Sequence, residues 1–273
     1  MEKNQSDICN FYQYKYNENE RMERNVLEFL RCKDIILRYL DNKNMEIADI
    51  GGATGAFSYW LSQMGHRVHL LDYVPLHIEQ AKENGRKLNL QLSSYTCGDA
   101  RQLPYQDNKF DVVLEMGPLY HLQCEDDRIS CLSEAMRVLK DNGTVLVEGI
   151  SRYANLFEGF QSDLILDNKF VDILNENLES GKHTPGDSPY FTTAYFHTPA
   201  VMVKELEQAG FKDISIIAVE GFAFALNVDC IYSDPIKMKL LLKYIRETEK
   251  IPDLLGASGH FIAIGKKTVD MKR

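Results

Sequence analysis

A run of small residues follows one short apolar stretch, and an aspartate follows the next. Asp49-Ile50-Gly51-Gly52-Ala53-Thr54-Gly55 closes the first stretch, and Asp72 closes the second, Val68–Leu71. Small residues let the backbone approach a ligand closely, and free N–H groups at a helix start suit an anionic group. A carboxylate about twenty residues further along can accept hydrogen bonds from both hydroxyls of a ribose. The pattern predicts a nucleoside site; the alternative is a tight turn and an aspartate that merely ends a strand.

The spacing of the glycines narrows the choice of nucleoside ligand. A dinucleotide fingerprint, G-x-G-x-x-G, requires glycines at positions 51, 53 and 56, where this chain has Gly51, Ala53 and Ala56. The observed spacing is G-x-A-x-G, with the last glycine at Gly55. A nicotinamide-dependent dehydrogenase is therefore excluded.

The segments that must hold these residues alternate between strand and helix. Amphipathic stretches such as Pro75–Leu88 and Asp126–Leu139 separate short apolar runs. This alternation is typical of a doubly wound α/β fold, whose parallel strands carry helices on both faces and bind ligands beyond their carboxyl ends. A longer helix is expected over Phe160–Leu178. The predicted strands are 47–50, 68–71, 92–97, 110–116, 144–150, 214–219 and 260–265.

The segment from Asp49 to Gly55 resembles the first motif of class I S-adenosylmethionine-dependent methyltransferases, an acidic residue followed by G-x-G-x-G. Ala53 replaces the middle glycine. The resemblance covers residues 45–150 well and the remainder loosely. It implies the Rossmann-like methyltransferase fold, a mainly parallel seven-stranded sheet with an antiparallel last strand. It also implies S-adenosylmethionine as cofactor and S-adenosylhomocysteine as product.

The resemblance assigns roles to matching positions of this chain. It implies that the turn binds the methionyl end, that Asp72 binds the ribose, and that Asp99-Ala100 bind the adenine. Glu115, Met116 and Gly117 would emerge beside the methionyl part, and the N-terminal segment would form a lid, with Arg21 pairing with the methionyl carboxylate. An ordinary exposed helix start is the alternative for that segment. The implied cofactor residues are Tyr16, Arg21, Gly51, Gly52, Ala53, Gly55, Asp72, Tyr73, Asp99, Ala100, Glu115, Met116 and Gly117.

The acceptor side is marked by two short segments. Gly117 to Leu122, with Tyr120 and His121, resembles the segment after the fourth strand in the quinone-biosynthesis-like group, where a histidine often faces the substrate. A histidine can act as a general base if the acceptor must lose a proton. The alternative is that His121 stands at the start of a helix and forms a hydrogen bond with a backbone carbonyl. Tyr120 is expected to place its ring against the sulfonium or the substrate, with plain packing in the core as the alternative. Expected substrate residues are Arg152, Tyr195 and His197, with a surface arginine and a packed aromatic loop as alternatives.

We expect four segments along the chain. Residues 1–44 form an N-terminal helical lid, and 45–150 form the cofactor-binding α/β core. Residues 151–197 form a substrate lid, and 198–273 complete the sheet with a helical insertion at 221–257. Both insertions are longer than a connection requires, which is typical of lids and substrate walls.

The amino-acid composition limits the classes of partner that the protein is expected to bind. Lys and Arg number 31 against 40 Asp and Glu, a net charge of −9, so we expect no nucleic-acid partner. The cationic stretch Lys237 to Lys243 is interpreted as a solvated face. The longest apolar runs are strand-sized, so we expect no membrane association, and a cytoplasmic monomer or homodimer. The cysteines form no C-x-x-C pair, and we expect no metal.

The function that fits these observations is methyl transfer from S-adenosylmethionine to a small-molecule acceptor at oxygen, nitrogen or activated carbon. In-line displacement at the methyl carbon relies mainly on proximity and alignment. One alternative is a non-catalytic protein that binds S-adenosylmethionine or a nucleoside. Another is a methyltransferase that acts on RNA or protein.

Overall fold

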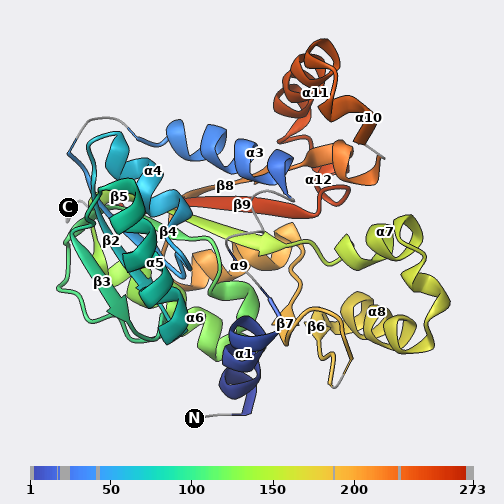
Figure 1. The fold of residues 1–273 in the computed structure, drawn as a ribbon, viewed down its shortest axis with the longest axis horizontal. Coiled ribbons are helices and arrows are strands. Elements are labelled where there is room, and N and C mark those ends of the chain that lie inside the picture. Colours follow the sequence, from blue (N-terminus) through green and yellow to red (C-terminus); the bar gives the residue numbers. More distant parts are fainter. Residues whose placement is uncertain are drawn as a thin grey trace, which may run out of the picture.

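The computed structural model describes residues 3–16, 18, 25–40, 44–186, 188–226 and 229–268. Within them, seven strands form one sheet in the order β3-β2-β1-β4-β5-β9-β8 (Figure 1). This confirms the predicted α/β class and the mainly parallel seven-stranded sheet. The strands are β1 (Glu46–Ile50), β2 (Arg67–Asp72), β3 (Ser94–Cys97), β4 (Phe110–Glu115), β5 (Leu139–Ile150), β8 (Lys212–Ala218) and β9 (His260–Lys266).

The direction of the strands gathers the predicted site at one edge of the sheet. The first five strands are parallel, and β9 pairs antiparallel with both β5 and β8, as predicted. Ile50 stands opposite both Leu71 of β2 and Glu115 of β4. The carboxyl ends of the three strands therefore meet, and the turns that follow them face a common space.

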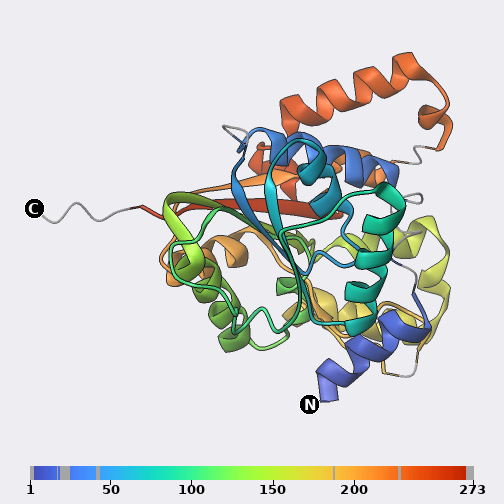
Figure 2. The same ribbon diagram turned by 60° about the vertical axis from the view of Figure 1, so that its left-hand side comes forward.

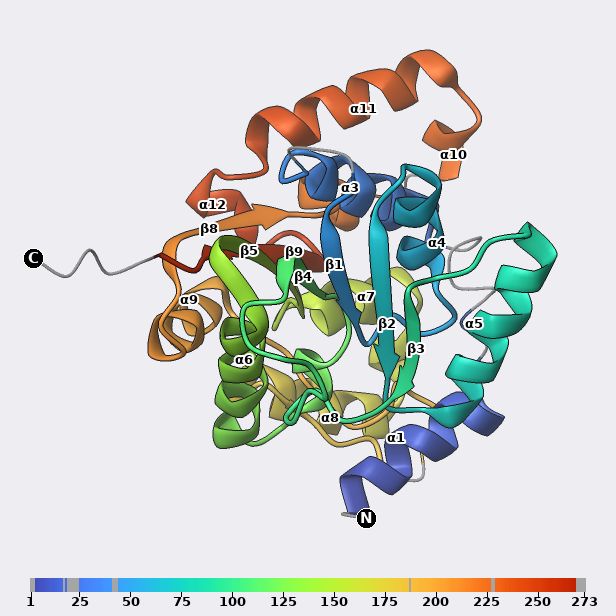
Figure 3. The same ribbon diagram turned by 90° about the vertical axis from the view of Figure 1, so that its left-hand side faces the viewer.

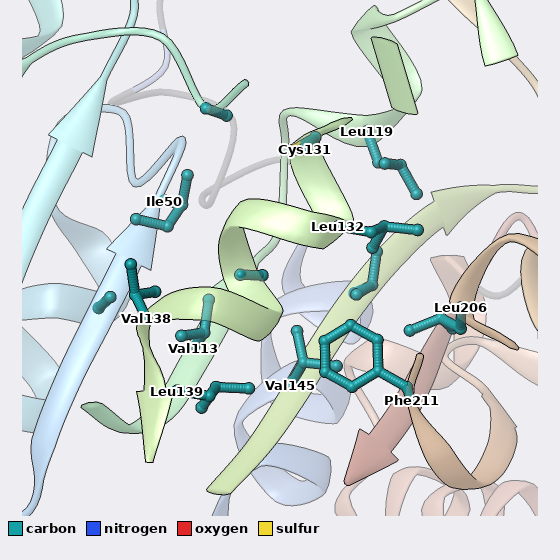
Figure 4. Packing of buried hydrophobic residues seen from close by; sticks show 14 of the residues in the cluster. Ile50, Val113, Leu119, Cys131, Leu132, Val138, Leu139, Val145, Leu206 and Phe211 are labelled. Atoms are coloured by element: carbon teal, nitrogen blue, oxygen red, sulfur yellow. The ribbon is translucent and has the colours of Figure 1, made fainter. Parts of the chain in front are cut away.

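Helices cover both faces of the sheet, and the alternation of side chains along the strands divides the core in two. Figure 4 shows part of the cluster beneath α6 (Glu125–Val138) and α9 (Pro199–Gln208), which includes Val113. Its neighbours Val112 and Leu114 belong to the opposite cluster. The helices of that second face are α3 (Val26–Leu37), α4 (Ala56–Gln63) and α5 (Pro75–Leu88).

The segment after β5 differs from the prediction of one helix over 160–178. It forms α7 (Ala154–Gln161) and α8 (Asn168–Ser180) with the 3-10 turn η2 (Leu164–Leu166) between them. Asp163 has a left-handed backbone with φ +57°, which ends the first helix, and the Asp167 side chain caps the second. The helical spacing of apolar residues was predicted correctly within each helix, but these two aspartates interrupt it between α7 and α8.

The remaining elements lie around the sheet. Helix α1 and helix α11 stand on opposite sides of the molecule in all three views (Figures 1, 2 and 3). No helix within the described ranges is long and apolar enough to cross a bilayer. The remaining elements outside the sheet are α1 (Lys3–Tyr14), η1 (Leu119–His121), β6 (Lys182–His183), β7 (Ala194–Tyr195), η3 (Gly221–Ala225), α10 (Asp229–Tyr232), α11 (Pro235–Thr248) and α12 (Pro252–Leu255).

Candidate active site

The small-residue turn after β1 holds its backbone against the ends of β2 and β4. The N–H groups of Gly51 and Gly52 donate to the Leu71 carbonyl at 2.7 and 3.2 Å. Gly51 has φ +71°, and a Cβ built there would lie 2.6 Å from Pro118 Cδ. A side chain at position 51 would meet both the strained backbone and the proline ring, so the turn requires glycine there.

Ala53 takes a left-handed conformation although it carries a side chain. Its φ is +46°, a region that costs an L-residue roughly 1–2 kcal/mol. Its N–H donates to Asp72 Oδ2 at 2.9 Å, and a hydrogen bond to a charged group offsets this strain. Gly55, at φ +89°, then precedes α4 as its N-cap residue. The turn therefore forms with alanine in place of the middle glycine.

Asp72 is held rigidly at the end of β2. Its carboxylate also accepts from the Val74 N–H at 2.8 Å and from His77 Nδ1 at 3.0 Å. The residue is 6% exposed. A carboxylate offers about four acceptor positions, so these three donors fix its orientation and leave acceptor capacity toward the space it faces.

Two cavities meet at the turn. The first extends from Asp72 along the ends of β3 and β4 to His121. The second lies beside the turn, between α3, α4 and β5, and shares Gly51, Ala53 and Met116 with the first. Of the predicted cofactor residues, the first cavity is lined by Gly51, Ala53, Asp72, Tyr73, Asp99, Ala100, Met116 and Gly117, and the second also by Gly52.

Asp99 lies on the wall of the first cavity in an ion pair with Arg101. The two Asp99 oxygens accept from Arg101 Nε at 3.1 and 3.2 Å, and Oδ2 also accepts from the guanidinium Nη2 at 2.8 Å. Arg101 Nη1 reaches Asp127 at 2.9 Å. Arg101 is not predictable from local sequence, because its contact with Asp127 joins residues 26 positions apart.

His121 lies on η1 between two different chain segments. Its Nε2 is 3.0 Å from the Tyr12 hydroxyl of α1, and its Nδ1 is 3.5 Å from the Thr193 carbonyl. A carbonyl only accepts, so the neutral ring carries its proton on Nδ1 and its Nε2 lone pair accepts from Tyr12. The Tyr120 hydroxyl donates to the Met116 carbonyl at 3.2 Å. Tyr12, Tyr120 and His121 all line the first cavity.

Helix α1 lines the first cavity with Ile8 and Tyr12, and aromatic contacts hold the helix in place. Tyr12 packs edge-on against His77 at 5.2 Å, and Phe11 meets Phe191 at 5.7 Å. Tyr16 stacks on Phe11 at 5.5 Å and lines neither cavity. Arg21 lies outside the described residues. Tyr12 was not predicted as a site residue, because nothing in the spacing of the N-terminal aromatic residues distinguishes it from its neighbours.

Buried carboxylates lie beside the turn and behind β4. Asp49 lines the second cavity; its Oδ2 accepts from Ser58 Oγ at 2.5 Å, while its buried Oδ1 has no hydrogen-bond partner among the described residues. Burial raises the pKa of Asp49 to about 6. Glu115 lines neither cavity, and its Oε1 accepts from Cys131 Sγ at 3.4 Å. Burial raises the pKa of Glu115 to about 7.

Arg152, Tyr195 and His197 come together, but they line neither of these two cavities. Arg152 Nη2 lies 3.3 Å from the Tyr195 hydroxyl, and the Tyr195 and His197 rings are 4.6 Å apart. His197 Nε2 is 3.1 Å from Glu205 Oε2, and Glu205 also accepts from buried Arg128 at 2.7 Å. The three side chains therefore belong to a polar cluster that joins β7 to α6 and α9.

A second buried polar group lies next to the second cavity. Ligand-type atoms of Glu28, Glu220 and His260 lie within 4.8 Å of one another, and His260 Nδ1 is 2.7 Å from Glu220 Oε1. Burial lowers the pKa of His260, but the charges of Glu220 and Glu28 outweigh it and raise the pKa to about 10. The imidazolium itself therefore supplies positive charge between the carboxylates at neutral pH.

The amino-acid sequence of this chain is similar to those of several known proteins. Residues 48–147 match the family described as "Methyltransferase domain". A demethylmenaquinone methyltransferase of Lactobacillus johnsonii is 31% identical over 161 residues, which are 58% of this chain and 63% of that protein. The chain thus spans less than two thirds of the length of that relative. A probable tRNA methyltransferase 9B of Homo sapiens is 32% identical over 37% of this chain and 20% of that protein.

A solved structure shows the same fold. Phosphoethanolamine N-methyltransferase 2 of Haemonchus contortus, solved with S-adenosyl-L-methionine, aligns with a TM-score of 0.60. The alignment is 14% identical and covers 98% of this chain and 61% of that chain. At this identity the likeness concerns the fold alone.

Proposed function

We propose that this chain, whose residues 48–147 match the family described as "Methyltransferase domain", is a class I S-adenosylmethionine-dependent methyltransferase that transfers a methyl group from S-adenosylmethionine to a small-molecule acceptor. One observation carries the proposal. A single cavity runs from Asp72 and Asp99, past Gly51 and Met116, to His121. It offers groups for a nucleoside at one end and a polar side chain suited to proton transfer at the other.

The residues at the turn fit S-adenosylmethionine. A Cβ at Gly117 would lie 3.2 Å from the Gly51 carbonyl oxygen. Glycine at both positions therefore lets the two backbone segments lie close together in the cavity wall. The orphaned Oδ1 of Asp49 is an acceptor that awaits a donor, and the methionyl ammonium would supply one. When bound, S-adenosylmethionine supplies an electrophilic methyl group on a cationic sulfur.

Different residues of the chain would hold the methionyl, ribose and adenine parts of the cofactor. The backbone of the turn and Asp49 would bind the methionyl end, and Asp72 would accept from the ribose beside Tyr73. Ala100 and the Asp99–Arg101 pair would border the adenine. Met116 would complete the wall between the two cavities. Glu115 is assigned to the fold rather than to the cofactor, because its carboxylate lies against Cys131 of α6.

His121 is the group we assign to proton transfer. Its Nε2 lone pair accepts from Tyr12, so a proton released by the acceptor would reach His121 directly or by way of the Tyr12 hydroxyl. The Tyr120 hydroxyl is engaged by the Met116 carbonyl, and we assign Tyr120 to positioning that wall. Arg152, Tyr195 and His197 would fix the segment that carries Thr193, and so the orientation of His121.

The acceptor class rests on charge and on the relatives. The chain has a net charge of −9, which disfavours binding to a phosphate backbone. The name of the Lactobacillus johnsonii relative indicates a small-molecule acceptor. The probable tRNA methyltransferases keep RNA as the second candidate acceptor. A non-catalytic binding protein would retain Asp72 and Asp99 but would not need a Tyr12–His121 pair on the cavity wall.

Methyl transfer to fractionated acceptors tests the proposal. The purified protein is incubated with S-adenosylmethionine labelled in the methyl group and with separate metabolite, RNA and protein fractions. We expect label in the metabolite fraction, and at least tenfold less with His121→Ala when the acceptor must lose a proton. Label in RNA or protein alone would overturn the small-molecule assignment. Tight binding of the cofactor without transfer to any fraction would favour the non-catalytic alternative.

A further inference from the structure

Helix α11 has an apolar stripe on the side that faces away from the protein. Ile236, Leu240 and Tyr244 are spaced by four residues and are 73%, 46% and 48% exposed. The opposite side of the same helix is buried, with Leu241 and Ile245 in a cluster with Leu27 of α3 and Ala223 of η3. The solvated polar face predicted for this segment is therefore apolar along its centre.

Cations border the stripe on both sides. At 100° per residue, Lys239 and Lys243 flank it on one side and Lys237 on the other. The Lys237, Lys243 and Arg246 side chains are 59%, 56% and 60% exposed, and each forms an ion pair, with Asp234, Glu247 and Asp34 at 3.9, 3.7 and 3.7 Å. Of the two glutamates near the end of the helix, Glu249 is buried in an ion pair with Arg31 and Arg38, whereas Glu247 is 54% exposed. Lys237, Lys239, Lys243 and Arg246 still outnumber the acidic Asp234 and Glu247 on α11 and its cap, so this face has a net positive charge in a chain whose net charge is −9.

The position of α11 leaves this face open. The helix lies on the outer side of α3, at the edge of the molecule in every view and away from α1 (Figures 1, 2 and 3). Since α1 lines the first cavity, the stripe and that cavity are on different sides of the fold. A partner on the stripe would not have to compete with ligands of the cavity.

Against the expectation of no membrane association drawn from the sequence, we propose that the outer face of α11 docks onto an anionic membrane surface. A helix whose apolar stripe is flanked by lysines lies in the interface, with the apolar side chains among the acyl chain ends and the cations near lipid phosphates. Each lysine near an anionic surface adds to the attraction, within about one Debye length. Tyr244 suits this position, because its ring is apolar and its hydroxyl reaches water.

Two other occupants fit the face less well. A nucleic-acid backbone would pair with the lysines but would leave Ile236 and Leu240 without apolar contact. A second copy of the chain, paired about a twofold axis, would bury the stripe but would bring Lys239 and Lys243 toward the same residues of its partner. An anionic bilayer satisfies both the apolar and the cationic parts. The inference does not depend on the methyltransferase proposal.

Vesicle binding of the full chain tests the docking. Sedimentation is measured with large unilamellar vesicles of phosphatidylcholine alone and of equal parts phosphatidylcholine and phosphatidylglycerol, at low and high salt. We expect binding to the anionic vesicles that weakens with salt, and little binding to the zwitterionic ones. Equal binding to both compositions, or none to either, would overturn the proposal. Stronger retention on RNA than on anionic vesicles would also overturn it.

Two triple variants separate the contributions. Lys237→Gln with Lys239→Gln and Lys243→Gln removes charge, and we expect anionic-vesicle affinity to fall about tenfold or more. Ile236→Gln with Leu240→Gln and Tyr244→Gln removes the stripe while retaining good helix formers, and we expect a similar loss.

Matched controls remove the same chemistry elsewhere. Lys82→Gln with Arg86→Gln and Lys87→Gln deletes three cations of α5 whose side chains are 43%, 71% and 67% exposed. Leu166→Gln changes an apolar residue that is 82% exposed. Both controls should keep vesicle affinity within about twofold. A loss as large as that of the α11 variants would show that net charge or general hydrophobicity, not this face, controls binding, and would overturn the proposal.

Discussion

Replacing Glu115 by glutamine should make the folded state less sensitive to pH. Glu115 is 0% exposed, and burial raises its pKa from 4.5 to about 7. The folded state thus binds this proton more tightly than the unfolded chain does. The contribution of Glu115 to stability is full below about pH 4.5 and declines as the pH rises to 7 and above.

The size of the effect follows from the shift. At 1.36 kcal/mol per pKa unit, a rise from 4.5 to about 7 corresponds to about 3 kcal/mol of stability lost by pH 8.5. Glutamine has the shape of the protonated acid and does not ionise. We therefore expect Glu115→Gln to exceed the wild type by less than about 1 kcal/mol at pH 5 and by about 3 kcal/mol at pH 8.5.

Urea unfolding of both proteins at pH 5, 7 and 8.5 measures this difference. Glu207→Gln, at an exposed position of α9, serves as the control and should shift stability by less than about 0.5 kcal/mol at every pH. Affinity for S-adenosylmethionine should stay within about twofold in Glu115→Gln. A variant with the wild-type pH profile would refute the burial argument. A large loss of cofactor affinity would instead place Glu115 in the site.

Three further changes test the turn, the base and the polar cluster. Gly51→Ala should lower stability by about 2–4 kcal/mol in thermal unfolding. The control Gly65→Ala should lower it by about 1 kcal/mol, because Gly65 has φ +91° but a Cβ built there has no atom within 4 Å. Equal losses would contradict the close approach at the turn. Tyr12→Phe should lower kcat about tenfold or more while the Kd for S-adenosylmethionine changes less than threefold; an unchanged kcat would remove Tyr12 from the proton path. Glu205→Gln should lower stability by about 3–5 kcal/mol in urea unfolding because it removes the negative charge that faces a buried arginine; a loss no larger than that of Glu207→Gln would show that this ion pair does not stabilise the fold.

Much of the sheet was predictable because its signals are local. Most strands contain a short apolar run, although β3, Ser94–Cys97, does not. The helices between them are amphipathic, so the order of elements follows from the sequence. The turn from Gly51 to Gly55 was equally visible, because positive φ and close approach restrict the residue types there. Even the placement of Glu115 was available in principle. Side chains alternate along a strand, and Val113, two residues earlier, packs beneath α6.

The rest of the site depends on contacts between distant segments. The Tyr12–His121 hydrogen bond joins residues 109 positions apart, and the Thr193 carbonyl reaches His121 from 72 positions away. No periodicity or spacing within one segment encodes such a contact. Arg152 and His197 were predicted to bind the substrate, and Tyr195 and Glu205 are the neighbours that contact them in the structure. Residue type alone does not show which distant side chains such residues pair with.

Calorimetric titration with S-adenosylmethionine, S-adenosylhomocysteine and NAD tests the central claim most directly. We predict that both adenosyl compounds bind and that NAD does not. Asp72→Ala should weaken their binding about tenfold to a hundredfold, because a charge-assisted hydrogen bond to the ribose is lost, whereas Asp172→Ala, at an exposed position of α8, should leave it unchanged. Binding of NAD, or no binding of either adenosyl compound, would contradict the account.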